Sequence, residues 1–414
     1  MRLCIFGYYG YGNAGDEAVL AGILRGLRIC GWEIGGIPSH APVLLREEAA
    51  AEEDAFYSIG AGRRLDVIVV SGDPAATREI HGVDAVARGH WRRLWTEAGQ
   101  ADAWVFGGGS LLQDVTGPWT LPYYISVLEL PRLHRTPIFF HAQGVGPIER
   151  PWQQLLAGRA LRRMKRISVR DAASAALIDR LTDGRVKAEL GADPVFLLDA
   201  PSAEERKAAW ERAVAAAWRS SAALPTTWVG VALRPWQGFD ASLPVLRQAL
   251  RALSEKTGAG VLLVPMQDAA DGPVARRIAD EWRARAMVAG VGTSFRERMA
   301  LLAGCSAVVG MRLHAVLFAA LSGVPGVALE YDPKVSAAAQ SLGWPTVSLP
   351  LTDPSTIIEV LERHLKQLDE ADAVRQRLRA AVAAERAKAL SDAAGLAREL
   401  VRLGNARKRR PARS

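Results

Sequence analysis

The stretch RLCIFGYYGYGNAGDEAVLAGILRGLR, residues 2–28, decides the fold class of this 414-residue chain. It passes from a short apolar run through a loop with glycines at positions 10, 12 and 15 into an amphipathic helical pattern. A buried strand, a glycine turn and such a helix open a parallel α/β sheet. The glycine spacing also matches the dinucleotide fingerprint G-x-G-x-x-G. Yet Asp16 and Glu17 follow the third glycine directly, where carboxylates would repel a pyrophosphate.

This glycine loop has several alternative roles. Backbone N–H groups at a helix N-terminus form an anion site by geometry and dipole, and Gly12 and Asn13 are candidate contacts there. Asp16 or Asn13 either caps the helix, or Asp16 serves in proton transfer. A dinucleotide site also requires an acid about 20 residues further on, at the end of a second strand. Glu33 has that spacing, but CGWEIGG is a poor strand.

The alternation of short apolar runs and helix-like stretches continues along the whole chain. The runs are VIVVSG, AWVFGGG, IFFHAQG and ISVRD in the first half, and VGVALRP, VLLVPMQD, AVVGMRLH and VALEY in the second. Two consecutive series of this kind predict two Rossmann-like domains with parallel sheets, facing each other across a substrate cleft.

The domain organisation follows from where these series start and stop. We expect a first domain at 1–198 with an irregular insertion at about 29–64, a linker at 199–225, a second domain at 226–355, alanine-rich helices that pack back at 356–402, and a basic disordered tail at 403–414.

Composition excludes several classes of protein. No run of 18 apolar residues exists, so we expect no membrane-spanning helix. The three cysteines, Cys4, Cys30 and Cys305, show neither metal-ligand spacing nor a disulfide framework, which indicates a reducing compartment. We therefore expect a cytoplasmic protein that holds no metal.

The charge of +8 is concentrated at the C-terminal end, in Arg407, Lys408, Arg409, Arg410 and Arg413. We interpret this tail either as a solvated terminus or as a segment attracted to an anionic membrane surface. Nucleic acid is not an expected partner, because no basic groove with interleaved aromatic residues occurs elsewhere.

Two further glycine loops end strands of the first series. In FGGGSLLQD, Gly108 and Gly109 predict close approach of backbone to a ligand or another loop, and Gln113 lies in the same stretch. In HAQGVGPI, His141 and Gln143 would point into the same rim of a parallel sheet. A lone histidine there is equally compatible with a hydrogen-bonded loop residue.

Arginines mark the strand ends that would bind an anion. Arg170 ends ISVRD, where it either binds a carboxylate or phosphate as a bidentate fork or pairs with Asp171 or Asp193. In GMRLHAVLFAALSGVP, Arg312 and His314 occupy the first turn of an apolar helix, where cations are unfavourable unless an anion completes the site.

The second domain thus offers a basic pocket and the first a carboxylate. Glu330, in EYDPKV after the next strand, lies on the rim of that pocket. We expect a small anionic substrate there, faced by Asp16 as an acid or base.

The motifs GYYGYGNAGDEAVL, VSGDPAATREIHGVDAVAR, FGGGSLLQD, HAQGVGPI, SVRD and GMRLHAVLFAALSGVP, in this order, resemble the polysaccharide pyruvyl transferase family, and within it the cell-surface-anchoring (S-layer) branch of Gram-positive bacteria. The resemblance covers most of residues 1–28 and 65–350. It implies a GT-B-like α/β fold and transfer of pyruvate from phosphoenolpyruvate to two hydroxyls of one sugar, with release of phosphate.

The resemblance also assigns residues. The phosphoenolpyruvate-binding set matches Arg170, Arg312, Leu313 through its backbone, and His314, and the suspected acid/base matches Asp16. Asp16 would take a proton from a sugar hydroxyl or donate one to C3, and His314 would bind phosphate and protonate it as it leaves. No metal or nicotinamide cofactor is required by this chemistry.

The branch implies a particular acceptor. This is a β-linked N-acetylmannosamine of a secondary cell-wall polysaccharide, on a lipid-linked or polymeric precursor at the inner membrane leaflet, where the basic tail would help.

Three other functions compete. A GT-B glycosyltransferase that uses a nucleotide sugar fits the fold and the helix-terminus anion site equally well. A nicotinamide oxidoreductase rests on the glycine pattern alone. A non-catalytic polysaccharide-binding module has no need for Arg312, His314 and Asp16 around one cleft.

Overall fold

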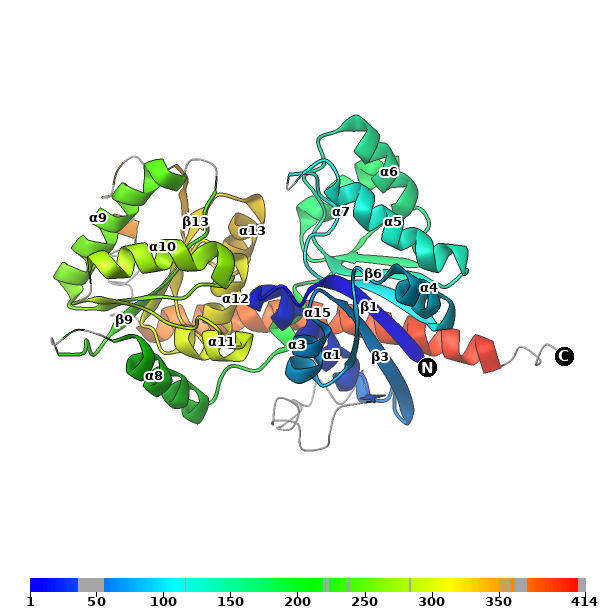
Figure 1. The fold of residues 1–414 in the computed structure, drawn as a ribbon, viewed down its shortest axis with the longest axis horizontal. Helices are drawn as coiled ribbons and strands as arrows, with labels where there is room; N and C mark the ends of the chain where they lie inside the picture. The colour runs from blue at the N-terminus through cyan, green and yellow to red at the C-terminus, as the bar shows by residue number, and fades with distance from the viewer. Residues whose placement is uncertain are drawn as a thin grey trace. The chain divides into compact units, whose positions relative to one another are not determined.

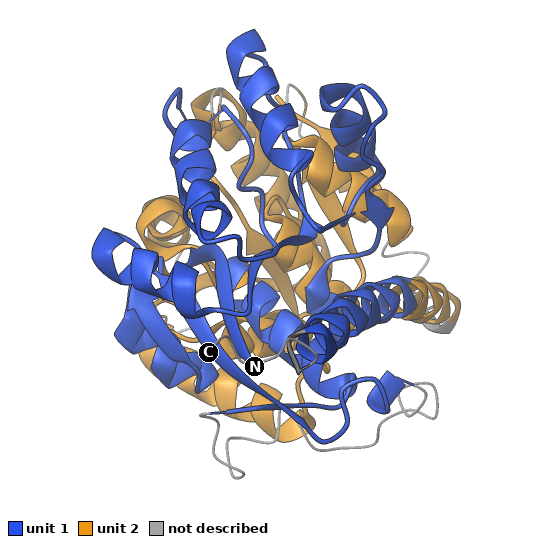
Figure 2. Cartoon of the chain, turned by 90° about the vertical axis from the view of Figure 1, so that its right-hand side faces the viewer, with its two compact units in different colours: residues 1–11, 16–198, 385–414 blue, residues 12–15, 199–384 orange. Residues whose placement is uncertain are grey.

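The computed structural model describes residues 1–35, 56–115, 117–218, 220, 223–236, 239–282, 284–350, 353, 355, 358–360 and 371–408. The chain divides into two compact α/β units (Figure 1, Figure 2). Unit 1 comprises Met1–Tyr11, Asp16–Leu198 and Glu385–Ser414, and unit 2 comprises Gly12–Gly15 and Asp199–Ala384. Among the described residues, no helix is long and apolar enough to cross a membrane.

Unit 1 is built on a parallel sheet in the order β2-β3-β1-β5-β6-β7-β8, with β4 paired to β3. Its strands are β1 (Arg2–Tyr9), β2 (Trp32–Ile34), β3 (Arg63–Ser71), β4 (Asp84–Ala87), β5 (Ala103–Gly107), β6 (Ile138–Gln143), β7 (Arg166–Val169) and β8 (Glu189–Leu190). Its helices are α1 (Ala14–Ile29), α3 (Pro74–His81), α4 (Trp91–Gln100), α5 (Thr120–Leu133), α6 (Pro151–Leu161), α7 (Ala172–Leu181) and the 3-10 helix η1 (Pro194–Leu197).

The central strands β1 and β5 of unit 1 are largely apolar and buried on both sides, because helices cover both faces of the sheet (Figure 1). Successive side chains of a strand point to opposite faces. Cys4 and Phe6 of β1, with Trp104 and Phe106 of β5, belong to the core cluster that includes residues of α4, α5, α6 and α7. The intervening residues of these strands therefore point to the opposite face.

Unit 2 holds a parallel sheet in the order β11-β10-β9-β12-β13-β14. Its strands are β9 (Trp228–Ala232), β10 (Gly260–Leu263), β11 (Ala286–Val288), β12 (Ala307–Gly310), β13 (Gly326–Glu330) and β14 (Thr346–Ser348). Its helices are α8 (Ala203–Ala217), α9 (Phe239–Thr257), α10 (Asp268–Glu281), α11 (Phe295–Ala303), α12 (Leu313–Leu321), α13 (Pro333–Ser341) and the first part of α15 (Ala371–Lys408).

Each sheet has one point where the strand order reverses. In unit 1 the reversal falls between β1 and β5, and in unit 2 between β9 and β12. In open parallel sheets, ligands bind outside the carboxyl ends of the strands at such a point. The candidate residues of the glycine loop and of the Arg312 turn follow β1 and β12, so both groups lie at a reversal point.

The segment at 29–64 differs from the expected irregular insertion. Trp32–Ile34 forms β2, which pairs in parallel with β3 and buries Trp32 and Ile34 while Glu33 stays exposed. Three residues are too few to show a period, so the sequence pattern missed this strand. Residues 36–55 lie outside the described part of the chain.

The segments around unit 2 also differ from expectation. The expected linker at 199–225 contains α8, which begins at a capping box formed by Ser202 and Glu205. Within the described part of the expected C-terminal helices, residues 358–360 are helical, and α15 continues to Lys408 and so includes the first half of the predicted disordered tail (Figure 1). Residues 409–414 lie outside the described part.

Candidate functional site

The glycine loop after β1 is shaped by backbone conformation and by a helix cap. Gly10 and Gly12 have φ angles of 76° and 66°, a left-handed region that favours glycine. The Asn13 side chain accepts a hydrogen bond from the Gly15 N–H at 3.0 Å, so Asn13 caps α1. Asp16 is the third residue of the helix rather than its cap.

Glu17 braces this loop. Its Oε1 accepts a hydrogen bond from the Gly10 N–H at 2.7 Å, and its Oε2 lies 2.8 Å from His81 Nε2 of α3. Both side chains are buried. The second acid of the opening motif is therefore structural, and His81, which sequence reasoning did not select, is its partner.

Asp16 lies against the glycines that end β5. Its side chain is buried, and a Cβ built on Gly109 would lie 3.4 Å from Asp16 Oδ1. Gly108 and Gly109 have φ angles of 63° and 75°, and a Cβ on Gly108 would lie 1.9 Å from Val19 Cγ1 of α1. Only glycine allows α1 to approach this closely, so the triple glycine positions Asp16 at the β1/β5 reversal point. We call Asp16, Gly108 and Gly109 the unit 1 site.

Three other candidates lie at or after the ends of β5, β6 and β7 in unit 1. Gln143 is buried and donates from Nε2 to the Gly108 carbonyl, and Gln113 is buried in the loop after β5. Arg170 donates to Asp193 at 2.6 Å and to Ser110 Oγ at 3.4 Å. The structure therefore shows the ion pair of Arg170 with Asp193, one of the alternatives that the sequence left open.

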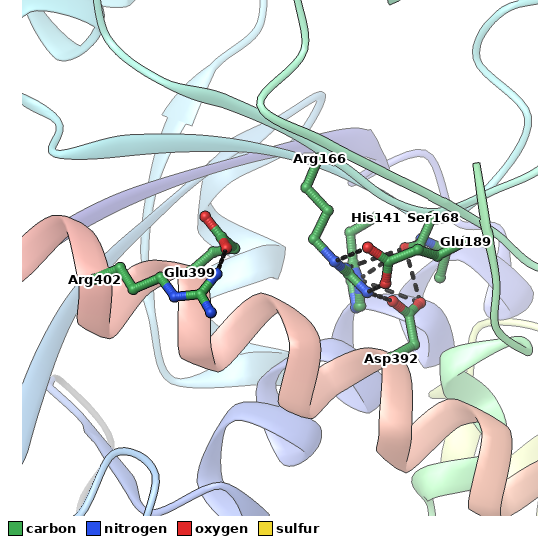
Figure 3. A network of polar contacts seen from close by, with 8 residues as sticks. His141, Arg166, Ser168, Glu189, Asp392, Glu399 and Arg402 are labelled. Atoms are coloured by element: carbon green, nitrogen blue, oxygen red, sulfur yellow. Dashed lines mark hydrogen bonds and ion pairs between the residues drawn. The ribbon is translucent and has the colours of Figure 1, made fainter. Parts of the chain in front are cut away.

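His141 does not reach the rim where the sequence placed it. It neighbours Phe140, which packs in the core cluster with α4–α7, so its side chain points to the opposite face. There it lies 3.4 Å from both Ser168 Oγ and Asp392 Oδ2 of α15 (Figure 3). Of the two interpretations of His141, the structure therefore shows a hydrogen-bonded residue and not a residue of the rim.

Asp392 is the centre of this network. Arg166 donates to it at 2.7 Å and Ser168 at 2.9 Å, and Arg166 also pairs with Glu189 (Figure 3). Burial alone would raise the pKa of Asp392, but His141, Arg166 and Ser168 outweigh burial and lower it to about 2. The network fastens α15 to the sheet of unit 1.

Arg312 defines the site at the β9/β12 reversal point in unit 2. Its Nε donates to Asp271 Oδ2 at 3.0 Å and its Nη2 to Asp271 Oδ1 at 2.5 Å, a bidentate pair buried at both ends. Asp271 Oδ2 also accepts from the N–H groups of Met266 and Gln267 at 3.0 Å. Asp271, 41 positions from Arg312, was not selected from the sequence.

A second buried arginine supports the same edge. Arg298 donates to the carbonyls of Gly290 and Met266 at 2.8 and 3.0 Å, and to Asp268 at 2.8 Å. It was also missed, because it lies in the middle of α11 and no local pattern distinguishes it from a surface arginine.

His314 lies in the first turn of α12, which Leu313 opens. A Cβ on Gly15 would lie 2.0 Å from His314 Nδ1, and the Ala14 N–H donates to the Met266 carbonyl at 2.8 Å. The glycine at position 15 is therefore required by the imidazole of His314, within the Gly12–Gly15 segment that clusters with unit 2.

Arg234 is a further arginine at this edge. β9 pairs with β12 so that Ala232 is opposite Gly310, and Arg234 and Arg312 each follow two residues later. Arg234 Nη1 donates to the Tyr331 hydroxyl at 3.1 Å, and its guanidinium lies 5.6 Å from that ring. Within the described residues no carboxylate pairs with Arg234. It ends the apolar run VGVALRP, so the strand-end signal that selected Arg170 could have identified it.

Glu330 ends β13, beside Tyr331, and accepts a hydrogen bond from Ser348 at 3.2 Å. The unit 2 site thus consists of Arg234, Arg312, Leu313, His314 and Glu330. Across the described ranges, no group of three or more His, Cys, Asp or Glu side chains could hold a metal ion.

Comparisons with known proteins agree on fold and family. A family model described as "Polysaccharide pyruvyl transferase" matches residues 13–333. Amylovoran biosynthesis protein AmsJ of Erwinia amylovora is 22% identical over 422 residues, covering 93% of this chain and 96% of AmsJ.

Solved structures share the fold at low identity. Anabaena Alr3699/HepE in complex with UDP and glucose has a TM-score of 0.58 at 13% identity, covering 97% of this chain and 100% of that chain. UDP-GlcNAc 2-epimerase from Methanocaldococcus jannaschii has a TM-score of 0.54 at 10% identity, covering 87% and 92%. The GT-B-like α/β fold class with parallel sheets is confirmed.

Proposed function

The chain belongs to the polysaccharide pyruvyl transferase family, and we propose that it transfers pyruvate from phosphoenolpyruvate to two hydroxyls of one sugar. The observation that carries the donor assignment is the cationic edge of unit 2. Arg234 and Arg312 follow the two strands of the reversal point, and Leu313 and His314 open the next helix. A compound with one phosphate and one carboxylate matches two arginines and a helix N-terminus.

The two arginines would contribute differently to donor binding. Asp271 compensates the charge of Arg312 and fixes the plane of its guanidinium. The cation of Arg234 has an aromatic hydroxyl and ring as its described partners, so its charge stays available for the anion. In the proposed reaction Arg312 orients the donor and Arg234 supplies net attraction.

The reaction balances without an external proton source. One sugar oxygen bonds to C2 of phosphoenolpyruvate while C3 receives a proton and becomes a methyl group. The C2–O bond to phosphate then breaks, and the second sugar oxygen closes the ketal. Of the two hydroxyl protons, one ends on C3 and one on phosphate.

Acid/base groups are the remaining requirement of this chemistry. Asp16 is the proposed proton-transfer group, taking a proton from a sugar hydroxyl or giving one to C3. His314 is proposed to bind the phosphate and protonate it on departure. The chemistry calls for no metal or nicotinamide, and we propose that none is used.

The proposed acceptor is an amino sugar on a lipid-linked or polymeric precursor, specifically a β-linked N-acetylmannosamine of a secondary cell-wall polysaccharide. The similarity to a biosynthesis protein for amylovoran supports a polysaccharide acceptor in general. We further propose that the enzyme works at the cytoplasmic side of the membrane, with the basic C-terminal residues near anionic lipid.

The deciding experiment mixes the purified full chain with phosphoenolpyruvate and methyl β-N-acetylmannosaminide, and follows phosphate release and ketal formation by mass spectrometry. Ketal and phosphate in equal amounts support the proposal. The competing function is tested with UDP-glucose as the donor, since the HepE structures of the same fold contain UDP. Glycosyl transfer from UDP-glucose with no ketal from phosphoenolpyruvate would overturn the proposal.

A further inference from the structure

Five aromatic rings surround one arginine at the carboxyl edge of the unit 1 sheet. Arg88 follows β4, and its guanidinium carbon lies 4.8–5.8 Å from the ring centres of Phe6, Tyr8, Tyr11, Tyr123 and Tyr124. A guanidinium attracts ring faces at such distances. Its Nη2 also donates a hydrogen bond to the Gly7 carbonyl. Arg88 therefore ties the glycine loop after β1 to helix α5.

The rings on the outer side of this cluster form a defined surface. Tyr8 and Tyr11 stack with centres 4.4 Å apart and planes 16° apart. Tyr11 also lies over Gly72, where a Cβ would come within 2.7 Å of the ring. Trp91 meets Tyr123 edge-on, with centres 6.2 Å apart. We name Tyr8, Tyr11, Tyr123 and Trp91 the tyrosine platform.

The rings of the platform are exposed to solvent, whereas the other rings around Arg88 are buried. Phe6 and Tyr124 are buried in the core, whereas Tyr11 is 39% exposed and Trp91 42% exposed. Tyr8 and Tyr123 are partly exposed. A contiguous group of exposed apolar side chains rimmed by polar groups is typical of a binding site, whereas single exposed apolar residues are ordinary surface. Packing in the hydrophobic core therefore explains Phe6 and Tyr124, but it does not explain the exposed rings Tyr11 and Trp91.

The platform adjoins the catalytic candidate of unit 1. Tyr8 is the second-last residue of β1, and the loop that follows this strand leads into Asp16, so both lie on the β1 side of the reversal point. Burial raises the pKa of Tyr8, and the neighbouring Tyr11 and Asp16 charges raise it further. Burial and Asp16 also raise the pKa of Tyr124 against the opposing effect of Arg88. The carboxylate and the rings therefore share one electrostatic environment.

We propose that the tyrosine platform binds a pyranose ring of the acceptor glycan, with Arg88 as the positioning residue that holds the rings. A pyranose presents an apolar C–H face that stacks on an aromatic ring, and a rim of hydroxyls that matches tyrosine O–H groups. Phosphoenolpyruvate is small and highly charged and has no such face. The platform therefore suits the acceptor, and this inference rests on the proposed function for the identity of the second substrate.

The test compares Tyr11→Ala with Tyr11→Phe in the full chain. Tyr11→Ala should raise the KM for methyl β-N-acetylmannosaminide about tenfold, equivalent to about 1.4 kcal/mol, and leave the KM for phosphoenolpyruvate within about twofold. Tyr11→Phe keeps the ring and should stay near the wild-type value. Arg88→Met should raise the acceptor KM as well, since the rings lose their common partner.

The matched control is Trp95→Ala, which removes an exposed aromatic side chain of α4 that packs on His134 outside the platform. It should change neither KM, and circular dichroism should show every variant folded. An acceptor KM that is unchanged in Tyr11→Ala, or raised equally in Trp95→Ala, overturns the platform.

Direct binding separates this inference from the proposed function. Saturation-transfer NMR from the tyrosine rings to methyl β-N-acetylmannosaminide, or to methyl β-galactopyranoside as a second probe, needs no turnover. If the wild-type chain forms no ketal, the proposed function fails. Transfer that is lost in Tyr11→Ala still supports the platform, and the absence of transfer to either probe in the wild type overturns it.

Discussion

The two candidate sites occupy the same topological position in their sheets and differ in how they are held. In unit 1, Asp16 lies against glycine backbone beside a group of tyrosines. In unit 2, Arg312 is fixed by a buried carboxylate and flanked by Arg234 and His314. The strand order that reverses beside β1 and β9 accounts for the location, and the loop residues alone account for the chemistry.

The way in which Asp16 and Arg312 are held predicts how a substitution at each position will affect the protein. A carboxylate that packs against glycine backbone can be replaced by the amide of the same shape, which keeps the packing and removes the charge. A group held by a buried ion pair cannot be replaced in this way, because its partner keeps an uncompensated charge. We therefore expect Arg312→Ala to change both activity and stability, and the isosteric Asp16→Asn to change mainly activity.

The largest effect is expected at Arg312. Arg312→Ala should lower kcat/KM for phosphoenolpyruvate by about 10²–10³-fold and destabilise the protein by about 3–5 kcal/mol, because Asp271 stays buried without its partner. Steady-state kinetics and urea unfolding measure the two effects. The double variant Arg312→Ala/Asp271→Asn should recover much of the unfolding free energy but not the turnover, because asparagine is uncharged and still accepts from the Met266 and Gln267 N–H groups. Recovered turnover in the double variant would remove Arg312 from the donor site.

The next effect concerns the two adjacent acids of the opening motif. Asp16→Asn should reduce kcat by about 10²–10³-fold with little change in urea stability. Glu17→Gln should cost about 1–3 kcal/mol of stability, because the Gly10 N–H and His81 lose a charged partner, with a smaller loss of kcat. A near-normal kcat in Asp16→Asn would contradict the assignment of Asp16 as the proton-transfer group.

A smaller effect is expected at Arg234. Arg234→Met should raise the KM for phosphoenolpyruvate by about 10–100-fold, since one charge-assisted contact to the anion is lost. Arg251→Met, an exposed arginine of α9 in the same unit, is the matched control and should leave the KM unchanged. Equal KM values in the two variants would exclude Arg234 from donor binding.

The smallest effect on activity is expected at Asp392, which belongs to neither site. Its folded-state pKa of about 2 lies below the usual aspartate value of 3.8, so its ion pairs stabilise the fold above about pH 4 and are lost as the pH falls through 2. Asp392→Asn should therefore be about 2 kcal/mol less stable than wild type at neutral pH, with the gap narrowing in urea titrations toward pH 2.

Because Asp392 belongs to neither candidate site, its substitution should change stability and leave activity nearly unchanged. Turnover of Asp392→Asn at pH 7 should stay within about twofold of wild type, with Asp66→Asn, an exposed carboxylate, as the stability control. A pH-independent gap would show that Asp392 does not stabilise the fold through its charge.

Local patterns predicted the positions of these sites but not their partners. The glycines at 10, 12, 108 and 109 predicted turns with close backbone approach, and each has a positive φ in the structure. His141 shows the limit of such reasoning. Its place two residues before a strand end suggested the rim, whereas the alternation of β6 directs it to the face that α15 covers. No pattern near residue 141 indicates that the helix that carries Asp392 lies there.

The sequence by itself determined the parallel α/β class, the two series of strands and the strand ends at which chemistry gathers, because apolar period and glycine turns are local properties. Only the tertiary structure decided which of two adjacent acids braces the loop, and that Arg170 pairs with Asp193 and Arg312 with Asp271. These pairings join residues distant in the chain. They depend on sheet register and helix approach, which the packing of the whole unit determines.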